Sequence, residues 1–338
     1  MPDHPASQPV PAGTLRADIF HADAELVLRR QPADSIHAVV TDPPYGLTSD
    51  TPIRELLQAW LAGDDFINSH DGYGGKDWDN SVPSPRLWRS AHRAMVPGGF
   101  LLAFAASRTA HLTAVALQLA GFEVRDTIHW VYSPGRPTSL DLVKQARNLD
   151  DPQAVQRLAG RRATLRPGHE PIVVARKPLA ATTTLENILD LGVGGIGLTG
   201  LDQPMATNVM HVHDLTCTAT TCDCGLAEHP GREHATQLYP STSLPHAAVS
   251  VPKPGASERP RSADGTAHPT VKPLLLMRQL IRAVTEPGHT VFDPFLGSGT
   301  TAEAALLEGR NAAGCEANAD YLPLIAQRLA RSRAELTD

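Results

Sequence analysis

The segment Asp42-Pro43-Pro44-Tyr45 carries the residue types best suited to chemistry, and it follows an apolar run at 36–40. That run predicts a short buried strand, which the two prolines cannot continue. The chain must therefore turn at the carboxyl end of the strand, where open α/β sheets hold their ligands. This set of groups suits an exocyclic amine on a flat ring, because Asp42 and the Pro43 carbonyl can accept its two hydrogens while Tyr45 stacks on the ring. An ordinary Asp-Pro turn with a surface tyrosine is the alternative interpretation.

A second candidate segment lies near the C-terminus and reads Asp293-Pro294-Phe295-Leu296-Gly297-Ser298-Gly299-Thr300-Thr301. It joins an apolar strand pattern to a helix pattern. The glycines allow close backbone approach to a ligand, and a helix N-terminus offers N–H groups to a carboxylate. Glu316 follows Gly297 by 19 residues, about the spacing at which an acidic residue takes ribose hydroxyls. No Gly-Lys-Ser/Thr follows the turn, which disfavours a phosphate-binding P-loop.

The elements that must position these two segments alternate between strand and helix patterns. We expect a strand, a turn and a short helix over 15–28, a mobile loop over 46–85, and irregular structure over 201–267. The other expected strands are 36–41, 100–105, 122–132, 171–175, 290–292 and 311–315, and the expected helices are 86–95 (ended by Pro97-Gly98-Gly99), 108–119, 274–284, 302–307 and 321–336. This alternation predicts an α/β fold with a parallel sheet.

One part of the chain is basic although the whole protein has a formal net charge of −6. Residues 136–178 hold nine Lys or Arg against four Asp or Glu. A solvated helix face explains most charge runs, but a phosphate-contacting surface needs the same residues. The candidates for DNA contact are Arg157, Arg161, Arg162 and Arg166.

Composition narrows the class of protein. A chain of 338 residues with 41% hydrophobic content fits one large domain, or one domain with an insertion. No apolar run reaches the roughly 18 residues of a membrane span. Residues 1–14 predict a disordered, Pro-rich tail without an apolar signal core, and hence a cytoplasmic protein with no membrane partner.

The cysteines form a weak candidate metal site. Three of the four are Cys217, Cys222 and Cys224, with His211, His213 and His229 nearby. Together they could hold tetrahedral zinc, but the spacing is not that of a standard zinc finger. A polar loop with free thiols is favoured, so no metal is assigned.

The two candidate segments, in this order, resemble the β group of DNA amino-methyltransferases that use S-adenosylmethionine. Other positions match that family in sequence: Asp23 in His-Ala-Asp-Ala, Asp77-Trp78-Asp79, Trp130-Val131-Tyr132, His169-Glu170-Pro171, and His268-Pro269-Thr270-Val271-Lys272-Pro273. Ala22 stands where the family has a glycine. The resemblance covers about residues 23–330 and is poorest over 201–260.

The resemblance implies a Rossmann-like methyltransferase fold in permuted order, with a mostly parallel twisted sheet and helices on both faces. It divides the chain into a catalytic half at 15–135, an inserted target-recognition region at 136–260 and a cofactor-binding half at 261–338. Asp42, Pro43, Pro44 and Tyr45 would be catalytic. The implied cofactor residues are Asp23, Thr270, Lys272, Asp293, Pro294, Phe295, Gly297, Ser298, Gly299, Thr300 and Glu316, with Lys272 on the cofactor carboxylate.

The implied activity is transfer of a methyl group from S-adenosylmethionine to the N6 amine of a flipped-out adenine in double-stranded DNA. Asp at the first position of the tetrapeptide favours adenine, but cytosine-N4 stays open. An RNA- or protein-amide methyltransferase, an NAD-dependent oxidoreductase and a non-catalytic DNA-binding module explain fewer of the motifs. A homodimer and a separate restriction endonuclease are further partners that the family implies.

Overall fold

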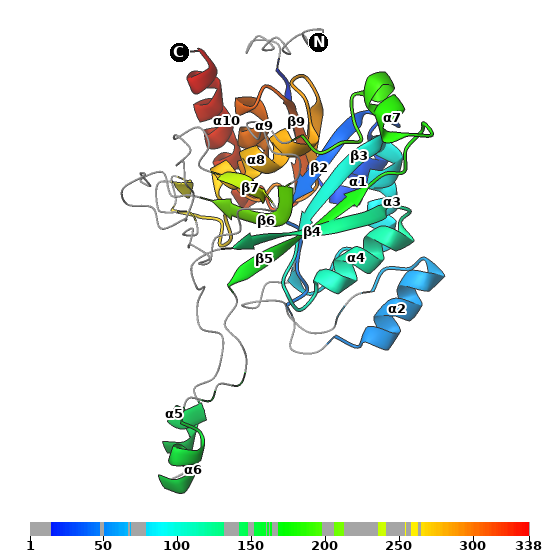
Figure 1. Cartoon of the computed structure of the whole chain (residues 1–338). Coiled ribbons are helices and arrows are strands. Elements are labelled where there is room, and N and C mark those ends of the chain that lie inside the picture. Colours follow the sequence, from blue (N-terminus) through cyan, green and yellow to red (C-terminus); the bar gives the residue numbers. More distant parts are fainter. Residues whose placement is uncertain are drawn as a thin grey trace.

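The computed structural model describes residues 15–47, 51–66, 68, 79–131, 142–147, 152–159, 161, 163, 168–197, 206–212, 236–240, 254, 258–262 and 265–337. They form a nine-stranded sheet covered by helices (Figure 1). The strands are β1 (Ala17–His21), β2 (Ile36–Thr41), β3 (Met95–Phe104), β4 (Glu123–Val131), β5 (His169–Arg176), β6 (Ala206–Val212), β7 (Thr236–Pro240), β8 (Thr290–Asp293) and β9 (Asn311–Glu316). The helices are α1 (Ala24–Arg30), α2 (Ile53–Ala62), α3 (Pro85–Ala94), α4 (Ala110–Leu119), α5 (Leu142–Arg147), α6 (Pro152–Arg157), α7 (Thr184–Leu191), α8 (Leu274–Val284), α9 (Thr300–Leu307), the 3₁₀ turn η6 (Ala319–Tyr321) and α10 (Leu322–Thr337).

The strand order is β1-β9-β8-β2-β3-β5-β4-β6-β7. Five strands, in the order β1, β9, β8, β2 and β3, run parallel to one another. Strand β5 is antiparallel to both β3 and β4. The chain leaves β8 towards β9 on one side, and it leaves β2 towards β3 on the other. The order in which the chain adds strands to the sheet therefore reverses between β2 and β8. Open α/β sheets bind ligands in the crevice outside the carboxyl ends of two such strands.

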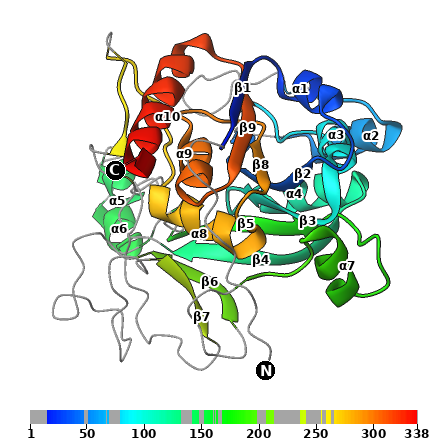
Figure 2. The same cartoon turned by 90° about the horizontal axis from the view of Figure 1, so that it is seen from above.

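Alternate residues of the strands enter two separate cores because successive side chains point to opposite faces. On one face, Val40 and Leu102 pack with residues of α8 and α9 and with Ile325 of α10. On the other face, Val39 and Leu101 pack with residues of α1, α3 and α4. Seen from above, the two groups of helices lie on opposite sides of the sheet (Figure 2).

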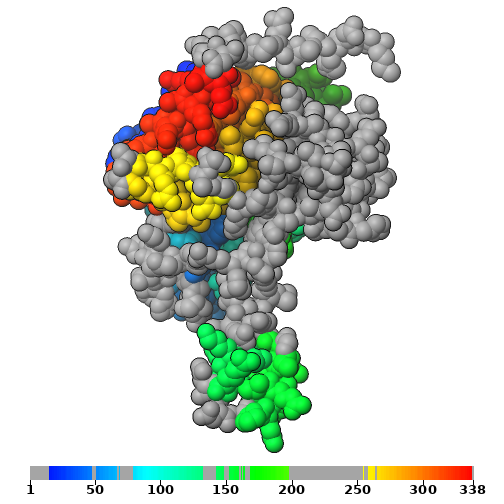
Figure 3. Space-filling model, turned by 90° about the vertical axis from the view of Figure 1, so that its left-hand side faces the viewer, coloured from blue at the N-terminus to red at the C-terminus, as the bar shows by residue number. Residues whose placement is uncertain are grey.

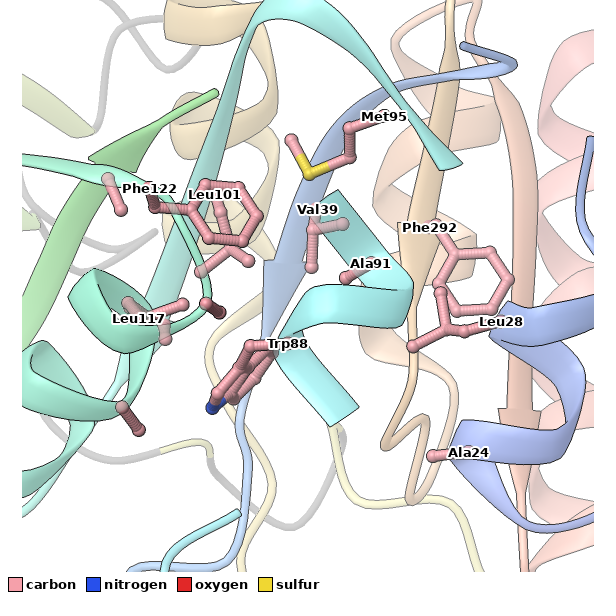
Figure 4. Close-up of a cluster of buried hydrophobic side chains, with 14 of the residues drawn as sticks. Ala24, Leu28, Val39, Trp88, Ala91, Met95, Leu101, Leu117, Phe122 and Phe292 are labelled. Carbon is pink, nitrogen blue, oxygen red and sulfur yellow. The ribbon is translucent and has the colours of Figure 1, made fainter. Parts of the chain in front are cut away.

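Trp88 of α3 stands at the middle of the second core and is fully buried. Figure 4 shows it below Val39 of β2, with Leu101 and Phe122 to one side and Phe292 and Leu28 to the other. Burying a large aromatic side chain contributes on the order of 2–3 kcal/mol. This core fixes β2 and β8 side by side, which sets the positions of the two segments that follow these strands.

The structure confirms the mostly parallel α/β sheet with helices on both faces and corrects several local expectations. The expected loop over 46–85 contains α2, whose Leu56 and Trp60 are buried. The expected irregular stretch over 201–267 contains β6 and β7, and α7 was not expected at all. The sequence does carry the helical spacing of α2, with apolar residues at 53, 56, 57, 60 and 61, but the polar, Gly- and Asp-rich residues around it favoured a loop, and β6 and β7 carry only short apolar runs.

The turn Pro97-Gly98-Gly99 does not end α3 but forms an irregularity inside β3. Helix α3 ends at Ala94, and β3 starts at the next residue. Ile36 of β2 pairs with Met95 and Ala38 with Phe100, so extra residues on β3 lie opposite one residue of β2. Gly98 has φ +87°, a conformation that glycine adopts easily.

The range 136–260, expected as one insertion, includes a strand of the central sheet. Strand β5 lies between β3 and β4, with Leu101 opposite Ala175 and Ile128 opposite Ile172. By contrast, α5 and α6 lie away from the sheet and its covering helices (Figures 1 and 3). None of the helices described is both long and apolar enough to cross a membrane.

Candidate functional site

The two candidate segments meet at the carboxyl ends of β2 and β8. Val39 of β2 pairs with Phe292 of β8, and the Thr41 hydroxyl donates a 2.7 Å hydrogen bond to Oδ1 of Asp293. These two residues are 252 positions apart in the sequence. The structure therefore brings the Asp42 turn and the glycine turn to one edge of the sheet, as the sequence predicted.

Asp293 is 2% exposed and joins three elements. Besides the Thr41 hydroxyl, it accepts the Thr301 hydroxyl at 2.6 Å and the backbone N–H of Phe295 at 2.9 Å. Burial raises the pKa of Asp293 to about 6, against the opposing effect of the three hydrogen bonds. The carboxylate thus ties the tip of β8 to β2 and to the start of α9.

The turn after β2 is held by a second buried carboxylate. Asp79, which is 4% exposed, accepts the backbone N–H groups of Tyr45 at 2.7 Å and Gly46 at 3.2 Å. Gly46 has φ +63°, and a Cβ there would lie 3.0 Å from the backbone nitrogen of Val82. Only glycine fits this turn without strain, so the local sequence fixes how Tyr45 is presented.

The side chain of Asp42 accepts hydrogen bonds at both oxygens. Oδ1 accepts the Tyr45 hydroxyl at 2.6 Å, and Oδ2 forms an ion pair with the ammonium of Lys272. Glu170 at the start of β5 contacts the same two donors, with Oε2 at 3.3 Å from the Tyr45 hydroxyl and 3.5 Å from Lys272 Nζ. Asp42, Tyr45, Glu170 and Lys272 therefore form one polar cluster.

Charge within this cluster is mostly hidden from water. Burial and the two nearby carboxylates raise the pKa of Tyr45 well above its usual value, so the phenol stays protonated. Burial acts to lower the pKa of Lys272, but Asp42 and Glu170 outweigh it and raise that pKa, so the amine stays charged. The cluster carries two carboxylates and one ammonium.

The glycine turn after β8 is closed by Glu316. Its Oε2 accepts the backbone N–H of Gly297 at 2.8 Å, and its Oε1 accepts that of Asn318 at 2.8 Å. Burial raises the pKa of Glu316 despite these bonds. A Cβ at Gly314 of β9 would lie 2.4 Å from the carbonyl oxygen of Asp293, so glycine is required where β9 passes the tip of β8.

The segment before α8 also lies against this turn. The His268 ring packs edge-on against Tyr321 at 4.6 Å, and it is the group that a Cβ at Gly297 would meet, at 2.9 Å from Nε2. His268 Nδ1 lies 2.9 Å from the Thr270 carbonyl oxygen, while the Thr270 residue itself is exposed. Burial lowers the pKa of His268.

Two of the predicted cofactor residues make contacts other than those expected. Asp23 caps α1, with Oδ1 accepting the N–H groups of Glu25 and Leu26. Lys272, expected on a cofactor carboxylate, is paired with Asp42 and Glu170. Sequence alone could not show this, because Lys272 is 230 residues from Asp42.

The remaining predicted residues lie along the two turns. Pro43 is buried and Pro44 is partly buried beside Asp42. At the glycine turn, Phe295 is partly buried, and the buried residues are Pro294, Gly297, Ser298, Gly299 and Thr300. The hydroxyls of Ser298 and Thr300 lie 3.4 Å apart.

The predicted DNA-binding and metal residues fall largely outside the described parts of the chain. Arg157 of α6 and Arg161 are exposed, whereas Arg162 and Arg166 lie outside the described residues. The three candidate zinc ligands Cys217, Cys222 and Cys224 also lie outside them. Within the described ranges, no group of three or more His, Cys, Asp or Glu could hold a metal ion.

Sequence reasoning did not assign a role to four residues of the site. Thr41, Asp79, Glu170 and Thr301 all contact the predicted residues directly. Glu170, Asp79 and Thr301 stood inside the motifs named above, which was the signal available. Thr41 carried none beyond its place at a strand tip.

Comparisons with known proteins agree with this architecture. The family model described as "DNA methylase" (N6_N4_Mtase) matches residues 36–327. The type II methyltransferase M.HindIII of Haemophilus influenzae is 26% identical over 331 residues, covering 92% of this chain and 94% of the relative. The DNA adenine methyltransferase YhdJ of Escherichia coli is 24% identical over 323 residues, covering 95% and 85%. The solved structure of the cytosine-N4-specific PvuII DNA methyltransferase is similar in fold, with a TM-score of 0.52 at 15% identity, covering 98% of this chain and 94% of that one.

Proposed function

The chain belongs to the DNA methylase family whose model spans residues 36–327, and on that basis we propose that it methylates the N6 amine of adenine in double-stranded DNA, with S-adenosylmethionine as methyl donor. One observation carries the proposal. The amine-accepting turn at Asp42 and the glycine turn at Gly297 follow adjacent parallel strands, and the Thr41–Asp293 hydrogen bond joins them.

The residues at the second turn fit S-adenosylmethionine by their chemistry. Asp293 and Glu316 are carboxylates at neighbouring strand tips, which suits a cationic ligand with ribose hydroxyls. Gly297 to Thr300 lead into α9, whose N-terminus suits a carboxylate. When bound, S-adenosylmethionine supplies an electrophilic methyl group. Asp293, Glu316 and the glycine turn would hold the cofactor, and Asp23 and Thr270 are kept as further contacts to it.

The residues at the first turn would prepare the amine. An exocyclic amine is a poor nucleophile because its lone pair is delocalised into the ring. Asp42 and the Pro43 carbonyl accept hydrogen bonds from the two N–H groups of the amine, which favours a pyramidal nitrogen with a free lone pair. Tyr45 provides a stacking face for a base taken out of the duplex. Positioning and fixed charges of this kind contribute several kcal/mol to a reaction barrier.

Adenine is favoured over cytosine for two reasons. The tetrapeptide begins with Asp, which is commoner in the adenine enzymes that this chain resembles. YhdJ, whose name gives an adenine specificity, is similar over 95% of the chain. The likeness to the PvuII enzyme concerns the fold and does not favour cytosine.

We assign recognition of the target sequence to 136–260, apart from β5. Helices α5 and α6 carry basic residues in their last turns, namely Lys144, Arg147 and Arg157, and stand apart from the sheet (Figure 1). Exposed basic side chains on a projecting segment suit contacts with DNA phosphates. The relative M.HindIII is named a type II methyltransferase, so the proposal includes protection of host DNA from a separate endonuclease. Light scattering would measure the proposed homodimer.

Nucleoside mass spectrometry tests the proposed function. Purified protein is incubated with unmethylated genomic DNA and methyl-labelled S-adenosylmethionine, and the digested nucleosides are separated. We expect labelled N6-methyladenine. Labelled N4-methylcytosine would identify cytosine and not adenine as the substrate, and absence of label in DNA would overturn the proposal.

A further inference from the structure

Glu170 belongs to the polar cluster, but the proposed chemistry gives it no task. It is the second residue of β5, opposite Trp130 of β4, and its side chain is 13% exposed. Its Oε2 lies 3.3 Å from the Tyr45 hydroxyl and 3.5 Å from Lys272 Nζ. These two groups are the same donors that occupy the two oxygens of Asp42.

Lys272 cannot be left without a counter-ion. Its side chain is 9% exposed, and Nζ lies over the rings of Phe104 at 4.9 Å and Tyr45 at 5.5 Å. Breaking a buried ion pair by removing one partner is strongly destabilising, because a charge is then left uncompensated. Any weakening of the Lys272–Asp42 pair therefore requires a second carboxylate within reach, and Glu170 is within reach.

The proposed function asks Asp42 to do something that Lys272 opposes. An ammonium at Oδ2 neutralises the negative charge that Asp42 presents to an incoming amine. Methyl transfer also places positive charge on the amine nitrogen, which a nearby ammonium disfavours. With Glu170 present, the cluster of Asp42, Glu170 and Lys272 keeps a net charge of −1.

We propose that Glu170 is a positioning residue that draws the Lys272 ammonium and the Tyr45 hydroxyl away from Asp42, so that the charge of Asp42 is directed at the target amine. The inference rests on the proposed function for the identity of the amine. It predicts that Glu170 acts through Lys272, and this separates it from a residue that merely supports the fold.

A double-mutant cycle measures that dependence. We expect Glu170→Gln, which keeps the side-chain shape but removes its charge, to lower the single-turnover methylation rate by about 10- to 100-fold while the dissociation constant of S-adenosylmethionine changes less than about threefold. In the Lys272→Met background the same change should cost less than about twofold, because the ammonium that Glu170 offsets is gone. Glu170→Asp should recover part of the lost rate.

The matched control is Glu123→Gln. Glu123 begins β4, the strand beside β5, and forms an ion pair with Arg176, but its side chain is 39% exposed. We expect its rate to equal that of the wild type. An equal loss for Glu170→Gln in both backgrounds, or no loss in the wild-type background, would overturn the inference.

A second readout does not depend on methylation. The chain has five lysines, so carbon-13 labelling at lysine Cε gives few NMR signals, and Lys272→Met identifies the one that belongs to Lys272. Because Glu170 contributes to the raised pKa of Lys272, Glu170→Gln should lower the pH at which this signal titrates. An unchanged titration would overturn the contact itself. If the wild type methylates no DNA, the proposed function fails, while this titration still decides whether Glu170 holds Lys272.

Discussion

The hydrogen bond between Thr41 and Asp293 offers a direct perturbation of the junction between the two turns. Thr41 is fully buried, and its hydroxyl donates to a carboxylate that is 2% exposed. Thr41→Val removes the hydroxyl and nearly conserves the volume, so the cost is that of the hydrogen bond together with its desolvated acceptor. Asp293 would keep the bonds from Thr301 and from the Phe295 N–H.

The size of the effect should depend on pH because the pKa of Asp293 is about 6. At pH 8 the acceptor is charged, and losing the bond should cost about 1.5–3 kcal/mol of unfolding free energy. At pH 5 Asp293 is mostly protonated, and the loss should fall to about 0.5–1.5 kcal/mol. In the wild type, a folded pKa above the ordinary value of 3.8 means that the contribution of Asp293 to stability is full below pH 4 and is lost as the pH rises through 6.

Urea unfolding at pH 8 and pH 5 measures both values. The control is Thr113→Val on α4, another buried threonine, whose cost should be the same at the two pH values. Because Thr41 directly precedes Asp42, we also expect slower methyl transfer from Thr41→Val at pH 8. A loss below about 0.5 kcal/mol at pH 8, or a loss equal at both pH values, would refute the role of this bond in joining the turns.

Three further predictions concern the cofactor turn, the basic helix α6 and a buried histidine. Glu316→Gln should weaken the affinity for S-adenosylmethionine, measured by calorimetry, by about 10-fold, the effect of about 1.4 kcal/mol. The methylation rate at saturating cofactor should stay within a few-fold of the wild type. An unaltered affinity would remove Glu316 from the cofactor site. Replacing both Arg157 and Arg161 by Gln should weaken DNA binding and reduce its salt dependence by about 0.9 in log–log slope per lost phosphate contact; an unchanged slope would show that neither residue meets DNA. Burial and the neighbouring His37 and Arg310 lower the pKa of His289 to about 4. Between this value and the ordinary pKa of 6.5, the folded state keeps His289 neutral while the unfolded chain takes up a proton. The free energy of unfolding should therefore fall as the pH drops from 6.5 to 4. His289→Asn should lose less stability than the wild type between pH 7.5 and pH 5 in urea unfolding, and an equal loss would contradict this.

The sequence predicted those parts of the fold that depend on local pattern. The strands predicted at 36–41 and 290–292 were clear from apolar runs that end in Asp-Pro, and the helix at 274–284 from its amphipathic period. Both turns of the site lay at strand tips, as expected. These features are local, because strand, turn and helix start are written in a few consecutive residues.

Contacts between distant residues could not be read in this way. Nothing near Lys272 in the sequence shows that its amine meets Asp42, and the antiparallel insertion of β5 between β3 and β4 brings Glu170 to the same place. Asp23 shows the opposite case, since its role as the cap of α1 was written locally in the sequence but was not assigned. Pairing between distant strands depends on the packing of the whole sheet, which a single sequence pattern does not contain.

The role of Asp42 in receiving the target amine is tested by Asp42→Ala, when cofactor binding and methyl transfer are measured on the same preparation. We expect an S-adenosylmethionine dissociation constant within about threefold of the wild type, because the donor lies at the other turn. We also expect a methylation rate reduced by at least about 10²–10³, the effect of about 2.7–4 kcal/mol of lost electrostatic stabilisation. A variant that still methylates DNA at close to the wild-type rate would contradict the claim that Asp42 receives the amine.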